Sequence, residues 1–186
     1  MAKTMVGTWG PAIVALLEPN SDLLEEILQV ARDHKIKSGV VHSIVGAFEK
    51  ATMQVFDKGG KHSHPVTIDG PLECHGGGLI GTVDAPLRGD QPFGRGGPTR
   101  GCDHPEGVGG YVHGDAYVHL HLTVTVGNET ISGHVMPGCI VRSHHPISHT
   151  TVMISPIENL ALTISTDGGP EAGNVGVYHK LVPSSS

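Results

Sequence analysis

The clearest pattern of apolar and polar positions along the chain is a strict alternation between Tyr117 and Val126. The Gly127-Asn128 pair that follows predicts a two-residue hairpin turn. We therefore expect a second strand that returns antiparallel to the first through His134. A period of two is typical of a β-strand with one buried face, and the apolar positions here are Val118, Leu120, Leu122, Val124 and Val126.

A second pattern, with apolar residues three and four positions apart, predicts an amphipathic helix. Ser21 or Asp22 is suited to be its N-cap, and Gly39 is suited to stop it. A stripe of this kind packs a helix against a sheet, so we assign it a structural role. The stripe consists of Leu23, Leu24, Ile27, Leu28 and Ala31.

The other regular segments predict further strands. Residues 12–17 are a short strand candidate, and the β-branched residues 40–56 suggest two strands that meet at a bulge or bend at Gly46. A later strand contains Gly76–Gly78, where the missing Cβ atoms let a neighbouring backbone or a ligand approach closely. Together these elements predict an α/β (α+β) domain, with a helix packed on an antiparallel-rich sheet.

Residues 88–114 show little periodicity. A compact domain rarely contains so long a loop unless it is a lid, a binding loop or a disordered segment, and Arg95 and Arg100 lie within it. We divide the chain into an N-terminal extension, a domain that includes this insertion, and a C-terminal extension, at residues 1–11, 12–166 and 167–186.

Composition narrows the class of protein. Of the 186 residues, 38% are hydrophobic and 16% charged, and 27 Gly with 13 Pro favour short strands and turns over a helical bundle. The net charge is −6 and the 12 Lys and Arg are scattered, so nucleic acid is a disfavoured partner. Three cysteines without close spacing favour a reducing cytoplasm. No apolar run reaches the roughly 18 residues of a membrane span, so we expect a cytoplasmic protein without a membrane partner.

Histidine is the residue type that stands out, with 14 copies where ordinary usage predicts roughly four. His119 and His121 share the polar face of the alternating strand. The two-residue turn pairs Val126 with Glu129, which places His121 opposite His134. Opposed Cβ atoms lie about 4.5 to 5.5 Å apart, so three imidazoles can share one ion at about 2.0 to 2.1 Å.

Three neutral nitrogen ligands favour a catalytic metal, because a fourth coordination position stays open. Zinc is the first candidate for this divalent ion, and Fe, Mn or Co also suit three imidazoles. The alternative is a solvated sheet face on which the imidazoles bind nothing. Further ligands or acid–base groups remain open among His113, His144, His145 and His149.

The order of these motifs along residues 12–166 resembles the plants-and-prokaryotes-conserved (PPC) domain family, in its prokaryotic single-domain type. The resemblance rests on the helix, the SIVGA turn, the PLE strand, the HLH strand and the SGH hairpin. It implies an antiparallel sheet with helix packing, assembly as a homotrimer, and metal binding in some prokaryotic members. Carried over, the metal ligands are His119, His121 and His134. Plant members add a DNA-binding AT-hook, whose Arg-Gly-Arg-Pro core is absent from FGRGGP here.

Two functions from different classes follow. The first is a metal-dependent enzyme that hydrolyses a lactone or ester-like bond in a small carboxylated or oxygenated metabolite. In that scheme Glu73 or His75 relays protons, and Arg142, Arg95 or Arg100 pairs with a substrate carboxylate. The second is a non-catalytic trimeric module that binds a ligand or metal and regulates a partner. Glu73, His75 and Arg142 also have ordinary structural roles open to them, as ion-pair, backbone-bonding and solvated side chains.

Overall fold

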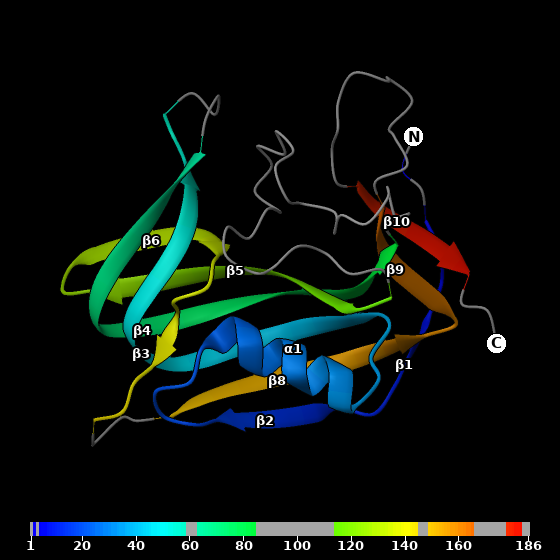
Figure 1. Cartoon of the computed structure of the whole chain (residues 1–186), viewed down its shortest axis with the longest axis horizontal. Helices are drawn as coiled ribbons and strands as arrows, with labels where there is room; N and C mark the ends of the chain where they lie inside the picture. Colours follow the sequence, from blue (N-terminus) through cyan, green and yellow to red (C-terminus); the bar gives the residue numbers. More distant parts are fainter. Residues whose placement is uncertain are drawn as a thin grey trace, which may run out of the picture.

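One sheet with a single α-helix against it makes up the described part of the chain (Figure 1). The computed structural model describes residue 2 and residues 4–58, 63–84, 114–144, 149–165 and 178–183. The elements in chain order are β1 Thr8–Trp9, β2 Ile13–Leu17, α1 Leu23–Asp33, β3 Gly39–Phe56, β4 Ser63–Asp84, β5 Ala116–Val126, β6 Glu129–Val135, β7 Ile140–Val141, β8 Thr150–Glu158, β9 Leu160–Ser165 and β10 Tyr178–Pro183.

Helix α1 begins as predicted and ends earlier than predicted. Asp22 is the N-cap, and its carboxylate accepts a hydrogen bond from the Leu24 backbone N–H at 2.9 Å. The helix ends at Asp33 instead of running to Gly39, because Lys35 adopts a left-handed φ of 54°. The Lys35 and Ile36 N–H groups then close back on the carbonyls of Arg32 and Ala31, a Schellman end in which glycine usually holds the left-handed position. The predicted apolar stripe is confirmed as buried.

The segment expected to form two strands is one continuous strand. β3 runs for 18 residues through Gly46, and its register shifts lie on either side of that glycine, between Val41 and Ile44 and between Phe48 and Lys50. Gly46 serves another purpose, because a Cβ there would lie 2.5 Å from the carbonyl oxygen of His149 on the approach to β8. The prediction of a break at Gly46 is therefore wrong.

Strand β3 is long enough to pair with different neighbours along its length. Its first half lies between β4 and β8, and its second half pairs with β4 and, at Met53 and Gln54, with β6. Because β5 pairs with both β4 and β6, the strands β3, β4, β5 and β6 close a ring of antiparallel pairings. The β4–β9 pairing is parallel, whereas the other strand pairings among the described residues are antiparallel. The predicted antiparallel-rich sheet is therefore confirmed.

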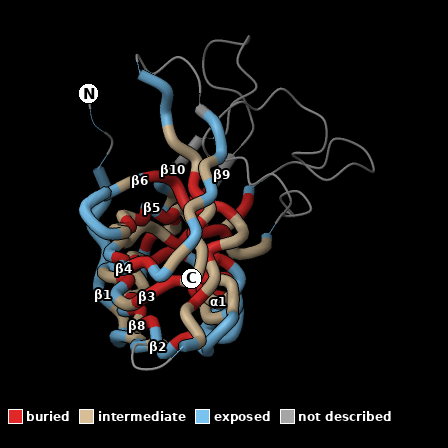
Figure 2. The backbone as a smooth tube through the Cα atoms, turned by 90° about the vertical axis from the view of Figure 1, so that its left-hand side faces the viewer, coloured by how far each residue is buried: buried red, intermediate tan, exposed pale blue. Residues whose placement is uncertain are grey.

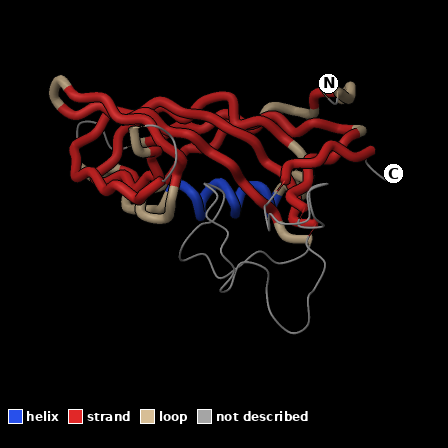
Figure 3. Tube along the Cα trace, turned by 90° about the horizontal axis from the view of Figure 1, so that it is seen from above, coloured by secondary structure: helices blue, strands red, loops and turns tan. Residues whose placement is uncertain are grey.

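Helix α1 lies on one side of the sheet, as Figure 3 shows from above. The core side chains come from the inner side of this helix and from the sheet. The buried tube in Figure 2 follows the central strands and the inner side of α1. A bidentate ion pair also ties the helix to the start of β5, where Arg32 lies 2.9 Å from Asp115 and holds the pKa of that carboxyl below its usual value. Fully buried side chains here include Leu23, Ile27, Ile44, Phe48, Leu120, Leu122 and Ile154.

Both ends of the described chain join the sheet. β1 pairs with β8, and β10 pairs with β9, so segments assigned to the N-terminal and C-terminal extensions contribute strands. The boundaries at residues 12 and 166 stay a prediction. Among the residues described, no helix has both the length and the apolarity to cross a bilayer.

Candidate metal centre

The hairpin formed by β5 and β6 has the predicted register. Val126 pairs with Glu129, and the pairing continues without a shift to His121 opposite His134. Successive side chains of a strand alternate between faces, so His119 and His121 both lie on the face opposite the core. We call this the outer face of the sheet. Sequence alone therefore placed three histidines together correctly.

The three imidazoles are close enough to share one ion. The Nε2 atoms of His119 and His121 are 3.1 Å apart, and the potential ligand atoms of His119, His121 and His134 all lie within 4.8 Å of one another. Bonds of about 2.0 to 2.1 Å in a tetrahedron separate neighbouring nitrogens by about 3.3 Å. One edge of such a tetrahedron is therefore present, and small side-chain rotations would close the others.

The three histidines differ in burial. His134 is 6% exposed, His119 is half-buried, and His121 is exposed. An ion bound by these three histidines would be covered by protein at His134 and accessible to solvent at His121. A small molecule can therefore approach from the solvent side, which a structural metal with four protein ligands would not permit.

Tyr117 is a neighbour of the histidine cluster that the sequence analysis did not identify. Its hydroxyl lies 3.1 Å from Nδ1 of His119, while the side chain itself is 5% exposed. When Nε2 of His119 binds an ion, its proton resides on Nδ1, which then donates to the Tyr117 oxygen. The signal was present in the sequence, because Tyr117 precedes His119 by two residues on the same face of the strand.

We expect Tyr117→Phe to lower metal affinity about 10- to 100-fold while the ring keeps its packing, because the hydrogen bond that orients His119 is lost. Competition against a chromophoric chelator measures the change. Thr125→Val is the matched control, since it removes a hydroxyl from the same face of β5. Equal affinities for Tyr117→Phe and the wild type would show that Tyr117 does not orient His119.

The glycines of β4 allow the strand that carries the histidines to approach. A Cβ at Gly76 would lie 2.5 Å from the carbonyl oxygen of His121, and one at Gly78 would overlap the carbonyl oxygen of His119. On the other side, a Cβ at Gly77 would lie 2.7 Å from the Val41 carbonyl oxygen. The predicted close approach is confirmed, with neighbouring backbone as the partner. Gly77 pairs with His121, so β4 presents no side chain beside the histidines at that position.

The predicted proton-relay residues lie at different distances from the histidines. His75 pairs with Thr123 and Glu73 with Thr125, so both project from the outer face. Measured along β5 from His121, these positions are about 7 and 13 Å away at about 3.3 Å per residue. His75 is therefore the nearer of the two, and both side chains are exposed.

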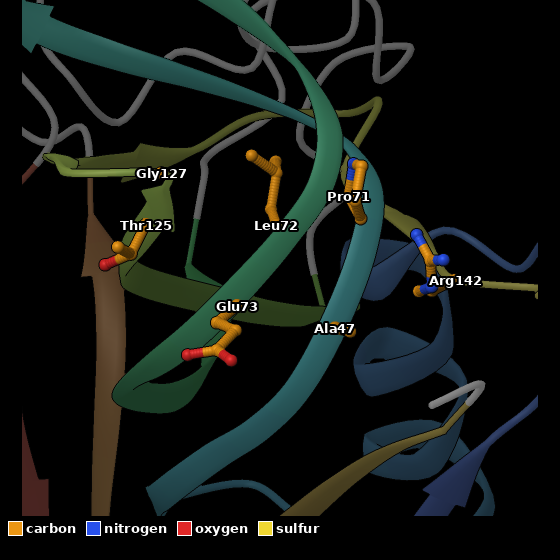
Figure 4. A pocket seen from close by; sticks show the side chains of 7 residues that line it. All are labelled: Ala47, Pro71, Leu72, Glu73, Thr125, Gly127 and Arg142. Atoms are coloured by element: carbon orange, nitrogen blue, oxygen red, sulfur yellow. The ribbon is translucent and has the colours of Figure 1, made fainter. Parts of the chain in front are cut away.

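Glu73 and Arg142 line a separate pocket (Figure 4). It has a volume of about 390 Å³, and Ala47, Leu72 and Thr125 also contribute to its wall. The structure thus places Glu73 and Arg142, which the sequence analysis assigned to one reaction, in the same pocket. This pocket lies at the hairpin end of β5, away from the three histidines.

Arg142 already has an anionic neighbour in this region. Its guanidinium lies 3.6 Å from the Glu49 carboxylate, whose other oxygen is 3.0 Å from Nδ1 of His144. The hydrogen bond with His144, the Ser143 N–H and the charge of Arg142 lower the pKa of Glu49. Arg142 is therefore partly neutralised. The other predicted carboxylate-binding residues, Arg95 and Arg100, lie outside the described residues, as do His113 and His145.

Neither of the two cysteines that the structure describes, Cys74 and Cys139, contributes a ligand to the candidate site. Burial raises the pKa of Cys74 and of Cys139 to about 12, and both side chains lie in the core. In a Cys102→Ser background, we expect both thiols to react with a disulfide reagent at pH 8 about a thousandfold more slowly than free cysteine, because thiolate is scarce. The same measurement in urea should show both thiols reacting fast, and fast labelling of folded protein would contradict the buried, protonated state.

The fold and the histidine cluster define a class of protein: a small α/β domain whose sheet carries a candidate three-histidine metal centre on its outer face. Residues 5–153 match the Plants and Prokaryotes Conserved (PCC) domain. The match covers well over half of the chain, and the protein therefore belongs to this family.

Solved structures share the fold. The "Metal-containing Protein AF0104" from Archaeoglobus fulgidus is 16% identical, with a TM-score of 0.63 over 89% of this chain and 93% of that one. A plant- and prokaryote-conserved protein from Pyrococcus horikoshii is 12% identical, with a TM-score of 0.61 over 91% and 92%. A protein titled "Putative DNA-binding protein" from Ralstonia eutropha JMP134 is 19% identical, with a TM-score of 0.57 over 92% and 90%. At these identities the likeness shows the fold alone.

A curated relative matches over part of its length. The bifunctional protein GlmU from Synechococcus sp. (strain JA-2-3B'a(2-13)) is 29% identical over 126 residues, which are 67% of this chain. The chain covers 14% of that protein. The activities of so much larger a protein therefore do not transfer to this chain.

Proposed function

We propose that this protein is a divalent-metal-dependent enzyme that hydrolyses a lactone or ester-like bond in a small carboxylated or oxygenated molecule. The observation that carries the proposal is the approach of His119, His121 and His134 within 4.8 Å beside an exposed edge. Three imidazoles with one side open match the ligand set of a catalytic metal. A neighbour of the same fold named as metal-containing supports this reading.

The donor set fits a borderline-soft divalent ion, with zinc first and Fe, Mn or Co as alternatives. When bound, such an ion polarises a carbonyl group and makes water a stronger acid. His119, His121 and His134 would hold it, and Tyr117 would fix the ring of His119. Water adds across the acyl carbon–oxygen bond and yields a carboxylic acid and a hydroxyl group, so the reaction needs no oxidant or reductant.

His75 is the residue that we assign to proton transfer. It projects from the same face as the histidine cluster, about 7 Å along the strand, which one water molecule can bridge. Glu73 is a more distant second choice. A substrate carboxylate would pair with Arg95 or Arg100, or with Arg142 where Glu49 leaves room.

We further propose a homotrimer in the cytoplasm, with a small molecule as the partner of each histidine cluster. Exposed apolar side chains on β2, β3 and β8 support association, since Val14, Leu16, Val45 and Met153 all project from the sheet into solvent. Sedimentation at several concentrations measures the assembly state.

A regulatory module that binds DNA is the second candidate, favoured by the designation of the Ralstonia eutropha neighbour. That designation disagrees with the expectation that nucleic acid is not a partner. The net charge of −6, with 18 Asp and Glu against 12 Lys and Arg, supports the small-molecule function over this one.

A hydrolysis screen separates the two candidates. Protein loaded in turn with zinc, cobalt, manganese and ferrous iron is assayed on lactones and esters, beside His121→Ala and the control His64→Ala. His64 is exposed and lies 2.7 Å from Asp57, away from the cluster. We expect turnover in the wild type and control that His121→Ala loses. Absence of turnover with every ion, together with salt-sensitive retention of DNA, would instead establish the regulatory module.

A further inference from the structure

A large apolar cavity lies at the end of the sheet where β9 and β10 join it. Its volume is about 730 Å³, within the range of about 300 to 1,000 Å³ typical of small-molecule sites. Lys180 is the one charged residue among the described residues that line it. The wall is otherwise made mainly of aliphatic side chains, from Met5, Leu79, Ile157, Leu160, Leu162 and Leu181.

The register of the sheet places this cavity beside the histidine cluster. Leu79, which lines the cavity, pairs with His119, so both side chains project from the outer face as direct neighbours. Side chains paired in this way have Cβ atoms about 4.5 to 5.5 Å apart. Two residues further along each strand, Tyr117 pairs with Gly81, which adds no side chain between the cavity and the Tyr117–His119 hydrogen bond. The cavity and the candidate metal centre are therefore adjoining parts of one surface.

The residues that line the cavity differ in solvent exposure. Leu160 and Leu162 are buried, at 7% and 8% exposed, whereas Leu181 is 38% and Met5 36% exposed at the rim. The lining is mainly aliphatic, and its polar side chains come from Ser38 and Lys180. Away from these two residues, a charged or hydroxylated group would lose its hydration without gaining hydrogen bonds. A hydrocarbon chain gains from burial there.

We propose that this cavity binds the hydrocarbon part of the substrate, and that the substrate is an ester or lactone with an aliphatic acyl chain. The chain would lie along Leu79 and between Leu162 and Leu181, and its carbonyl end would reach the histidine cluster past His119. The identity of the reacting group rests on the proposed hydrolase function, whereas binding of the hydrocarbon chain does not.

Chain length is the variable that tests the cavity. Each methylene group that leaves water for an apolar wall should improve kcat/KM about fourfold. We expect this gain on p-nitrophenyl esters from acetate to octanoate with metal-loaded protein. A second measurement needs no catalysis: n-alkanols from butanol to octanol should displace the fluorescent probe N-phenyl-1-naphthylamine from metal-free protein with the same dependence on length.

Two variants test whether the dependence on chain length arises in this cavity. Leu181→Glu puts a charge at the rim, where partial exposure allows the strand to fold, and should abolish the dependence on chain length in both measurements. Leu181→Trp narrows the cavity without adding a charge. It should reduce the chain length beyond which a further methylene group no longer improves kcat/KM or displacement. Phe56→Glu is the control, because Phe56 is 65% exposed at the end of β3 and does not line the cavity.

The outcomes distinguish the two proposals. Displacement that strengthens with chain length, without hydrolysis, keeps the hydrocarbon site and removes the hydrolase. Hydrolysis with no dependence on chain length keeps the hydrolase and overturns the hydrocarbon site, as would a dependence that Leu181→Glu and Leu181→Trp leave unchanged. A flat response in both measurements also overturns it.

Discussion

His121→Ala is expected to purify almost free of metal, whereas the wild type, prepared without chelator or nickel affinity resin, carries about one divalent ion per chain. The loss follows from geometry, because His121 supplies one of three nitrogens and lies 3.1 Å from its neighbour on His119. At an ion concentration of about 100 times Kd, the bound ion adds about 2.7 kcal/mol to the free energy of unfolding. The variant should lose that gain. Elemental analysis and thermal unfolding with and without added zinc measure both effects.

The apo form of His121→Ala should remain as stable as the apo wild type, within about 0.5 kcal/mol, because an exposed side chain is removed. His64→Ala is the control, an exposed histidine outside the cluster that should keep the full metal content. Metal at one ion per chain in His121→Ala, or no metal in the wild type after zinc addition, would mean that the three imidazoles do not hold an ion together.

Gly78→Ala is expected to have the second large effect, a loss of about 1 to 3 kcal/mol or more in the free energy of unfolding. The new Cβ would overlap the carbonyl oxygen of His119, and neither strand can yield without moving backbone. Because β5 carries two of the three metal ligands, its displacement should also weaken metal binding. Urea unfolding of the apo protein and zinc titration of the folded fraction measure the two effects separately.

Gly127→Asn is the matched control for this substitution. Gly127 lies in the hairpin turn with φ of 57°, nothing within 4 Å of a Cβ built there, and asparagine tolerates that backbone conformation. The control should change stability by about 0.5 kcal/mol at most. If Gly78→Ala proved equally mild, the close packing of β4 against β5 would not be what requires glycine at this position.

Short-range patterns were sufficient for the elements nearest to the site. Alternation from Tyr117 to Val126 and the two-residue turn determine which residues pair, because a strand has a period of two and the turn sets the register. The stripe of α1 was equally readable, since it depends on local spacing. The end of α1 could not be predicted from the sequence, because Lys35 occupies the left-handed position where glycine is the usual signal.

Contacts between residues far apart in the sequence could not be predicted from such local patterns. Nothing local shows that β3 continues through Gly46, because the glycine is required by the approach of Thr150 from another strand. The same holds for Glu73 and Arg142, which the sequence assigned to the histidine reaction and the sheet places in their own pocket.

By itself, then, the sequence determined the α/β class, which follows from the helical stripe and the strand patterns. It also determined that three histidines share one cluster and one face, which follows from the periodicity of one hairpin. Only the tertiary structure decided what lies beside that cluster on the neighbouring strands: the absence of a β4 side chain at Gly77 and the apolar cavity that begins at Leu79. These neighbours come from β4, β9 and β10, and strands distant along the chain meet only through packing of the whole sheet, for which no local spacing is a substitute.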